Sequence, residues 1–193
     1  MKNYLFILSI LFFIVSCKRE TVRYDKPYFD FDSLVQAQLK QLSKLKTVVA
    51  KKSKLNSKTG SVSFAPDTAQ WKHELDPFIQ LDAINKPMFK EAYHVQVKED
   101  DHSNLQILEC SSKIKSPVPW VKFYYQNDLK KLKKIESIYE EGNLMFSSQR
   151  KLLLEFDTRE DQLILTHYQV KGFQKMILSD TTSYLLDGAI RFQ

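Results

Sequence analysis

The feature that most constrains this fold is a change of pattern near residue 90, after which apolar side chains recur at every second position. Tyr93, Val95 and Val97 alternate with polar residues, and β-like runs follow at 104–112, 118–126, 132–140, 143–157, 162–170, 173–178 and 183–192. Such alternation is typical of strands with one face on a core. The breaks between runs are short, and parallel neighbours need crossovers of a dozen or more residues. We therefore predict an antiparallel meander.

Gly172 separates two of these runs, 162–170 and 173–178. A glycine at this position fits a two-residue turn, and it fits equally well a bulge inside one long strand. The pattern leaves both readings open.

Two earlier segments have helical spacing instead. In residues 31–46 the apolar positions fall 3.6 residues apart, and Asp30 or Asp32 can cap the start. The second helix is predicted over about 67–84, with Asp67 or Thr68 at its start. Pro77 interrupts it, so either the helix kinks there or Asp76 caps a separate helix that begins at Pro77.

A hairpin is predicted between the helices, from β-like runs at 47–54 and 61–65 with Gly60 in the turn. The composition is 43% hydrophobic, which is enough to build a core in a single domain over residues 29–193. The predicted class is α+β, with two N-terminal helices packed on a large antiparallel β-meander sheet. A half-open barrel with the helices in its mouth is the alternative form.

The first residues of the chain have the pattern of a signal peptide. Lys2 supplies a positive charge, and the run 4–15 contains Ser9 as its one polar residue. That run is shorter than the roughly 20 residues that a membrane-spanning helix needs. We therefore assign residues 1–16 to a signal peptide that is removed from the mature protein.

The residues Ile14-Val15-Ser16-Cys17 resemble the lipobox of bacterial lipoproteins, in which a branched apolar residue and a small residue precede a cysteine. Ile14 and Val15 depart from the favoured residues but stay within the pattern. The resemblance implies cleavage before Cys17 and lipidation there, with a thioether-linked diacylglycerol and often a third acyl chain such as palmitate. Residues 17–28 then form a tether, and two or three acyl chains make a lasting anchor.

The chain also resembles lipoproteins of the Bacteroidota, which combine a helical start containing a Trp71-x-x-Glu74-Leu75 type segment with a β-rich end. That likeness implies no activity. In lipoproteins of that phylum, an acidic run after the lipidated cysteine resembles a signal for export to the cell surface. No such run follows Cys17. The resemblance therefore favours the periplasmic face of the outer membrane. Once Cys17 is acylated, Cys110 has no intramolecular partner, and we expect it to be a buried small hydrophobe.

The search for catalytic or metal-binding residues gives only weak candidates. His73-Glu74 begins like a zinc-protease motif, but Pro77 stands where the second histidine belongs, so His73 and Asp76 are read as a helix-surface pair. Glu99-Asp100-Asp101-His102 has ligand-like groups, yet a solvated hairpin loop is the favoured reading. No phosphate-binding glycine motif and no Gly-x-Ser-x-Gly elbow occurs, and we predict no cofactor.

Two basic runs and one aromatic run complete the candidates. For the basic runs, solvated strand and loop edges are favoured over attraction to an anionic membrane or an acidic glycan, and no nucleic-acid partner is expected. For the aromatic run, core packing is favoured over a ligand cleft. The residues are Lys51, Lys52, Lys54 and Lys58; Lys130, Lys131, Lys133 and Lys134; and Trp120, Phe123, Tyr124 and Tyr125.

Two classes of function follow from these features. The first is a membrane-anchored envelope lipoprotein with a structural role or a non-enzymatic binding role, whose partner is an envelope protein, lipid or glycan. The second is an enzyme on envelope polymers whose site residues meet only in space. A closed apolar cavity between helices and sheet would indicate a lipid carrier. The missing catalytic motifs favour the first class.

Overall fold

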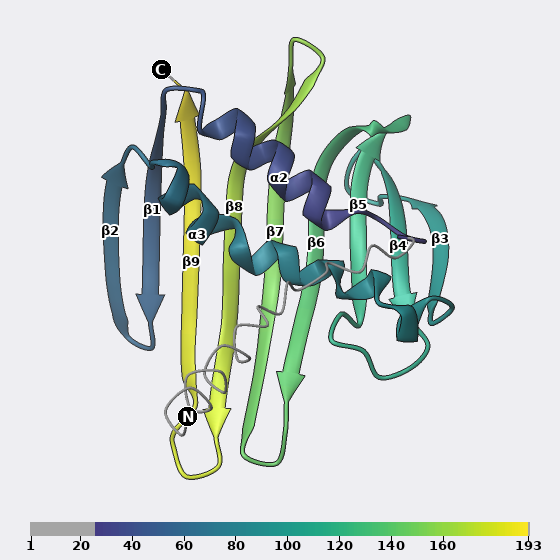
Figure 1. Ribbon diagram of the computed structural model, residues 1–193, viewed down its shortest axis with the longest axis vertical. Coiled ribbons are helices and arrows are strands. Elements are labelled where there is room, and N and C mark those ends of the chain that lie inside the picture. Colours follow the sequence, from purple (N-terminus) through teal and green to yellow (C-terminus); the bar gives the residue numbers. More distant parts are fainter. Residues whose placement is uncertain (1–25, 193) are drawn as a thin grey trace, which may run out of the picture.

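The computed structural model describes residues 26–192, which form one antiparallel sheet with two helices across one face (Figure 1). The elements follow in chain order: α2 (Phe31–Leu42), β1 (Thr47–Leu55), β2 (Lys58–Phe64), α3 (Thr68–Ile79), the 3-10 helices η2 (Gln80–Asn85) and η3 (Pro87–Phe89), β3 (Tyr93–Glu99), β4 (Gln106–Ser112), β5 (Trp120–Gln126), β6 (Asp128–Gly142), β7 (Phe146–Arg159), β8 (Gln162–Met176) and β9 (Thr182–Phe192).

The nine strands lie in the order β2-β1-β9-β8-β7-β6-β5-β4-β3. The predicted α+β class and large antiparallel sheet are confirmed, and the sheet does not close into a barrel. The predicted order of elements is wrong, because the two helices do not both precede the sheet. The β1–β2 hairpin comes between them, and β1 pairs with the last strand from Thr47↔Phe192 to Leu55↔Tyr184. Periodicity identifies strands, but it does not indicate that β1 pairs with a strand as distant in sequence as β9.

Gly172 lies inside the single long strand β8, opposite Arg150 in regular register, so it is neither a turn nor a bulge. The register of β7 and β8 shifts instead between Glu155 and Phe156. A Cβ at Gly172 would lie 2.4 Å from the Gln149 oxygen and 3.0 Å from the Tyr184 hydroxyl. Only a glycine allows the Gln149 oxygen and the Tyr184 hydroxyl to approach the backbone so closely at this point of the sheet.

The β1–β2 turn consists of Asn56 and Ser57, so the prediction of Gly60 in the turn is wrong. Asn56 has a φ of 52°, a left-handed conformation that asparagine adopts more readily than most residues. Its backbone N–H donates to the Ser183 carbonyl, and its side-chain oxygen accepts from the Ser183 N–H at 2.8 Å. These bonds extend the pairing of β1 with β9 by one residue and fix the turn there.

Each helix begins at an aspartate. Asp30 caps α2 by accepting from the Ser33 N–H, and the helix ends at Leu42 rather than at residue 46. Asp67 caps α3 and forms a capping box with Gln70. The helix continues through Pro77 to Ile79 and passes into η2, so Asp76 does not start a separate helix.

The core lies between the helices and the covered face of the sheet. Leu152, Leu154 and Phe156 point into it, as their alternation predicts, and each is at most 5% exposed. Gln38 reaches from α2 to the Leu163 oxygen and the Leu165 N–H at 2.8 Å each. Gln38 thereby satisfies backbone groups of β8 beyond the last residue that pairs with β9.

Candidate functional site

The space between helices and sheet is filled with large side chains. Trp71 and Phe78 from α3 and Tyr168 from β8 belong to one core cluster, with the Phe78 and Tyr168 rings edge to face, and all three are less than 2% exposed. Phe31 from α2 stacks on Phe123 of β5 with 5.9 Å between ring centroids. The hollows described for residues 26–192 lie elsewhere.

A polar link joins α3 to the sheet beside this core. Glu74 accepts hydrogen bonds from the Lys51 ammonium at 2.6 and 2.8 Å and from the Tyr168 hydroxyl at 2.7 Å. Burial, followed by the bond to Glu74, raises the pKa of the Tyr168 phenol far above its usual value. The Trp71-x-x-Glu74-Leu75 segment thus places two core side chains and one sheet-facing carboxylate on the same helix.

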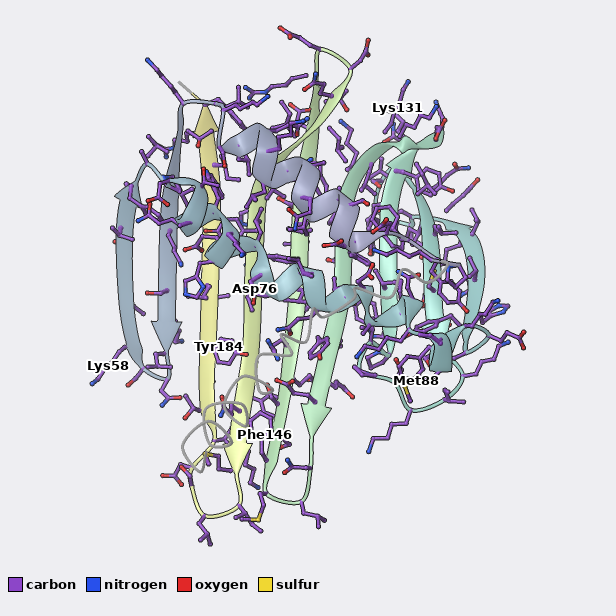
Figure 2. The ribbon with its side chains drawn as sticks, viewed as in Figure 1. Lys58, Asp76, Met88, Lys131, Phe146 and Tyr184 are labelled. Atoms are coloured by element: carbon purple, nitrogen blue, oxygen red, sulfur yellow. The ribbon has the colours of Figure 1, made fainter. Side chains whose placement is uncertain are left out.

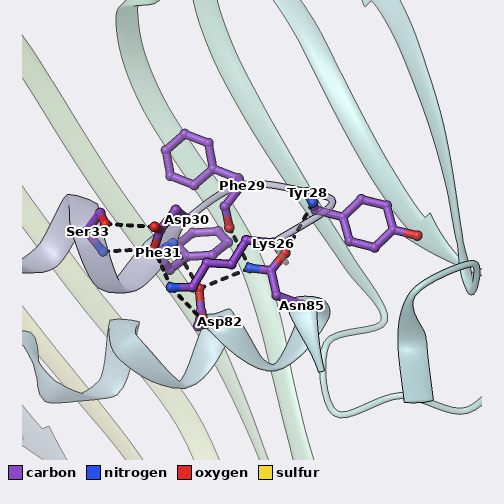
Figure 3. A network of polar contacts seen from close by, with 8 residues as sticks. All are labelled: Lys26, Tyr28, Phe29, Asp30, Phe31, Ser33, Asp82 and Asn85. Atoms are coloured by element: carbon purple, nitrogen blue, oxygen red, sulfur yellow. Dashed lines mark hydrogen bonds and ion pairs between the residues drawn. The ribbon is translucent and has the colours of Figure 1, made fainter. Parts of the chain in front are cut away.

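A second polar network holds the start of the described chain against η2 (Figure 3). Lys26 pairs with Asp30 and with Asp82, at 3.2 Å in the second pair. Asp82 also accepts from the Phe31 N–H, and Asn85 accepts from the Tyr28 N–H, both at 3.2 Å. Partial burial alone would raise the pKa of Asp30, but its bonds from Lys26 and Ser33 outweigh burial and lower that pKa. These contacts fix the first described residues of the chain beside η2.

The face of the sheet opposite the helices carries a histidine between two carboxylates. His167 Nδ1 lies 3.0 Å from Glu155 on β7, and its Nε2 lies 3.3 Å from Asp187 on β9. Gln169 donates to the same Asp187 at 2.7 Å. Because each carboxylate takes a different ring nitrogen, the three groups do not converge on one point. Among residues 26–192, no cluster of three metal-ligand side chains is placed to hold an ion.

This open-face cluster continues toward β3 as a row of paired charges. The Lys134 ammonium lies 3.8 Å from the centroid of the Tyr124 ring, and the Tyr124 hydroxyl donates to Glu136 at 3.0 Å. Burial and that bond raise the pKa of Tyr124 above its usual range. Glu109 pairs with Lys98 at 2.5 Å, and Lys122 stands 3.9 Å away. The row consists of cross-strand pairs that stabilise a sheet.

The largest of the three hollows described for residues 26–192, here called the β6–β7 groove, has a volume of about 930 Å³. It lies between the loop that joins β4 to β5 and the adjoining ends of β6 and β7. Pro117, Leu144, Phe146 and Phe173 give it apolar walls, and polar groups line the remainder: Lys115, Ser116, Glu140, Glu141, Asn143, Ser147, Ser148 and Gln149. A concave surface that combines apolar side chains with polar groups is a common form of ligand site.

A smaller hollow of about 330 Å³ lies at the C-terminal end of α2. Lys44, Lys46 and Arg159 surround an apolar floor that includes Ile164 and Phe192. The Arg159 guanidinium lies 4.2 Å from the centroid of the Phe192 ring, so this cation already has a partner in the fold.

The structure places the sequence candidates apart. Cys17 lies outside the described residues. Cys110 is 3% exposed, and burial, with a smaller contribution from Glu109, raises the pKa of its thiol to about 11. His73 and Asp76 line a shallow hollow on the outer side of α3. In the acidic loop, Asp100 accepts from the Ser103 hydroxyl, which lowers the Asp100 pKa.

Within each basic run, some lysines are exposed and others are paired, and the residues of the aromatic run also differ in burial. Lys52, Lys54 and Lys58 are exposed on strands near the β2 edge, whereas Lys51 pairs with Glu74. Lys130 and Lys131 are exposed, while Lys133 and Lys134 pair with Asp157 and Glu136. Phe123 is in the core beneath α2, Tyr124 and Tyr125 are buried, and Trp120 is half-buried with Lys122 over its ring.

The His167 cluster escaped sequence reasoning because its members stand 12 and 20 residues apart on three strands. A search against protein-family models and a search of curated proteins both found no match for this sequence. Within residues 26–192, the helices are too short or too polar to cross a bilayer.

Proposed function

We propose that this chain is a lipid-anchored binding protein of the bacterial cell envelope, held through Cys17 on the periplasmic face of the outer membrane. The β6–β7 groove is the observation that carries the binding role. It is large enough for an extended ligand, and its apolar walls and scattered polar groups suit binding of an envelope protein segment, lipid or glycan. The anchor keeps the groove within the layer next to the membrane.

His167 is the observation that would favour an enzyme instead. A general base needs a free nitrogen within reach of the substrate proton. Both ring nitrogens of His167 are engaged by Glu155 and Asp187, and none of these residues lines one of the described hollows. The filled helix–sheet interface argues in the same way against a lipid carrier with a closed cavity there.

We expect Cys17→Ser to abolish incorporation of radiolabelled palmitate, because serine has no sulfur to form the thioether. Cells that express the full chain are labelled, and the protein is isolated and its radioactivity measured per molecule. Cys110→Ser is the matched control, since it removes the other cysteine and should keep the full label. Label that persists in Cys17→Ser would contradict the anchor.

The groove is tested by photocrosslinking. We expect benzoylphenylalanine at Phe173, which lines the groove and is 38% exposed, to form discrete adducts in intact cells. The same residue at Val62 is the control, because Val62 is 54% exposed on the edge strand β2 and lies outside the groove. Equal adduct patterns at the two positions, or none at Phe173, would contradict a binding role for the groove.

A further inference from the structure

Two neighbouring turns at one end of the sheet expose a group of large apolar side chains. Leu144 and Met145 lie in the β6–β7 turn, and Met176, Ile177 and Leu178 lie at the β8–β9 turn; together they are called the apolar tip. Leu144 and Leu178 are each 95% exposed, and the other three are between 54% and 59% exposed. Soluble proteins rarely leave such groups together in water, and contiguous patches mark interaction sites.

The two turns form one unit. Phe146 pairs with Met176 across β7 and β8, and the Ile177 N–H donates to the Met145 oxygen at 3.0 Å. Figure 1 shows both hairpins projecting beyond the β1–β2 turn, at the end of the molecule opposite the end of β9. In the register, Leu55 beside the β1–β2 turn lies level with Tyr184 and Gly172, several residues short of the tip. Along the strand direction, the apolar tip therefore projects further than the β1–β2 turn.

The chemistry of the tip suits hydrocarbon better than a protein partner. Residues 143–149 and 176–179 contain no charged side chain. Arg150, Lys175 and Asp180 stand at their borders, and Arg150 pairs with Glu141. The usual anchors of protein interfaces are aromatic and arginine side chains in packed pockets, with methionine also enriched. The five exposed residues of the tip include no aromatic or arginine side chain, and they lie on projecting turns. Apolar side chains of amphipathic helices enter the boundary between headgroups and acyl chains by about 5–10 Å, and projecting apolar turns can enter the same boundary.

The length of chain before the described residues agrees with this placement. Nine peptide steps separate Cys17 from Lys26, and they reach at most about 30 Å. Lys26 is fixed near Phe31, whose ring stacks on Phe123, and Phe123 is level with Leu154 on β7. The eight steps from Leu154 to Phe146 span about 26 Å along a strand. A lipid on Cys17 can therefore lie in the plane that the tip reaches.

We propose that the apolar tip inserts into the membrane leaflet that holds the Cys17 lipid, as a second point of attachment. This inference rests on the proposed anchor. Two separated attachments fix the orientation of the domain, which a single point of attachment cannot do. Because Leu144 and Phe146 also line the β6–β7 groove, the groove then opens beside the lipid surface.

The test uses the mature lipidated protein in vesicles of phosphatidylethanolamine and phosphatidylglycerol. A cysteine is introduced by Leu178→Cys, or by Met145→Cys as a second tip site, and is labelled with an environment-sensitive fluorophore. Lys131→Cys is the control, because Lys131 is exposed at the end of the molecule away from the tip (Figure 2). Cys110 does not compete at neutral pH, because its thiol is buried with a pKa of about 11 and reacts only as thiolate.

We expect both tip labels to shift their emission to the blue and to be quenched by doxyl lipids, while the Lys131→Cys label keeps its aqueous spectrum. Tip labels that stay aqueous on protein that floats with the vesicles would overturn tip insertion and leave the anchor standing. Protein that does not float would contradict the anchor itself. A blue shift without doxyl quenching would assign the tip to a protein contact and overturn its insertion.

Discussion

Gly188→Ala is expected to destabilise the fold by about 3 kcal/mol, near the upper end of the cost of overpacking a core. Gly188 on β9 pairs with Tyr168 on β8, and the Tyr168 ring lies across its backbone. A Cβ at Gly188 would lie 2.2 and 2.4 Å from two ring carbons and 2.6 Å from the hydroxyl oxygen. The ring cannot move freely, because it is 1% exposed and its hydroxyl is bonded to Glu74. Urea unfolding followed by circular dichroism measures the loss.

Gly60→Ala is the matched control, since Gly60 lies on the edge strand and its added Cβ would meet only the Ser53 hydroxyl, at 3.2 Å. We expect a change below about 1 kcal/mol there, because a small side chain can rotate away. In a Tyr168→Leu background, Gly188→Ala should lose most of its additional cost, since the clashing ring is gone. An equal cost in both backgrounds would show that the clash is not the cause.

The sequence predicts the regular part of this fold well, because strand alternation and helix caps are local. Leu152, Leu154 and Phe156 are core residues on the period-2 pattern, and Asp30 and Asp67 are helix caps. The pairing of β1 with β9 joins residues more than a hundred positions apart, and no local signal encodes it. For the same reason, the sequence around Gly188 does not indicate that the Tyr168 ring packs against this glycine.

Sequence patterns do not predict the His167 cluster or the apolar tip, for two different physical reasons. His167, Glu155 and Asp187 meet only through strand register, which sequence spacing does not reveal. The apolar residues of the tip belong to patterns that predict strands: the run 143–157 includes Leu144 and Met145, and the run 173–178 includes Ile177 and Leu178. In the structure β7 begins at Phe146 and β8 ends at Met176. Apolar residues in a turn beyond the end of a strand cannot pack against a face of the sheet.

Glu74→Ala is the other substitution with a large expected effect, a loss of about 2–3 kcal/mol. Removing one partner of a buried ion pair costs about 3–5 kcal/mol because the other charge stays buried. We take a lower figure because the Glu74 and Lys51 side chains are 12% and 19% exposed. The change also leaves the Tyr168 hydroxyl without its acceptor. Thermal unfolding should show the loss as a lower midpoint.

Asp76→Ala is the control for this experiment, because Asp76 is an exposed carboxylate two residues away on the same helix. We expect a change within about 0.5 kcal/mol, as for surface positions generally. Adding Lys51→Met to Glu74→Ala should restore part of the stability, since no unpaired ammonium then remains against the sheet. If Glu74→Ala cost no more than Asp76→Ala, the link between α3 and the sheet would rest on Trp71 and Phe78 alone.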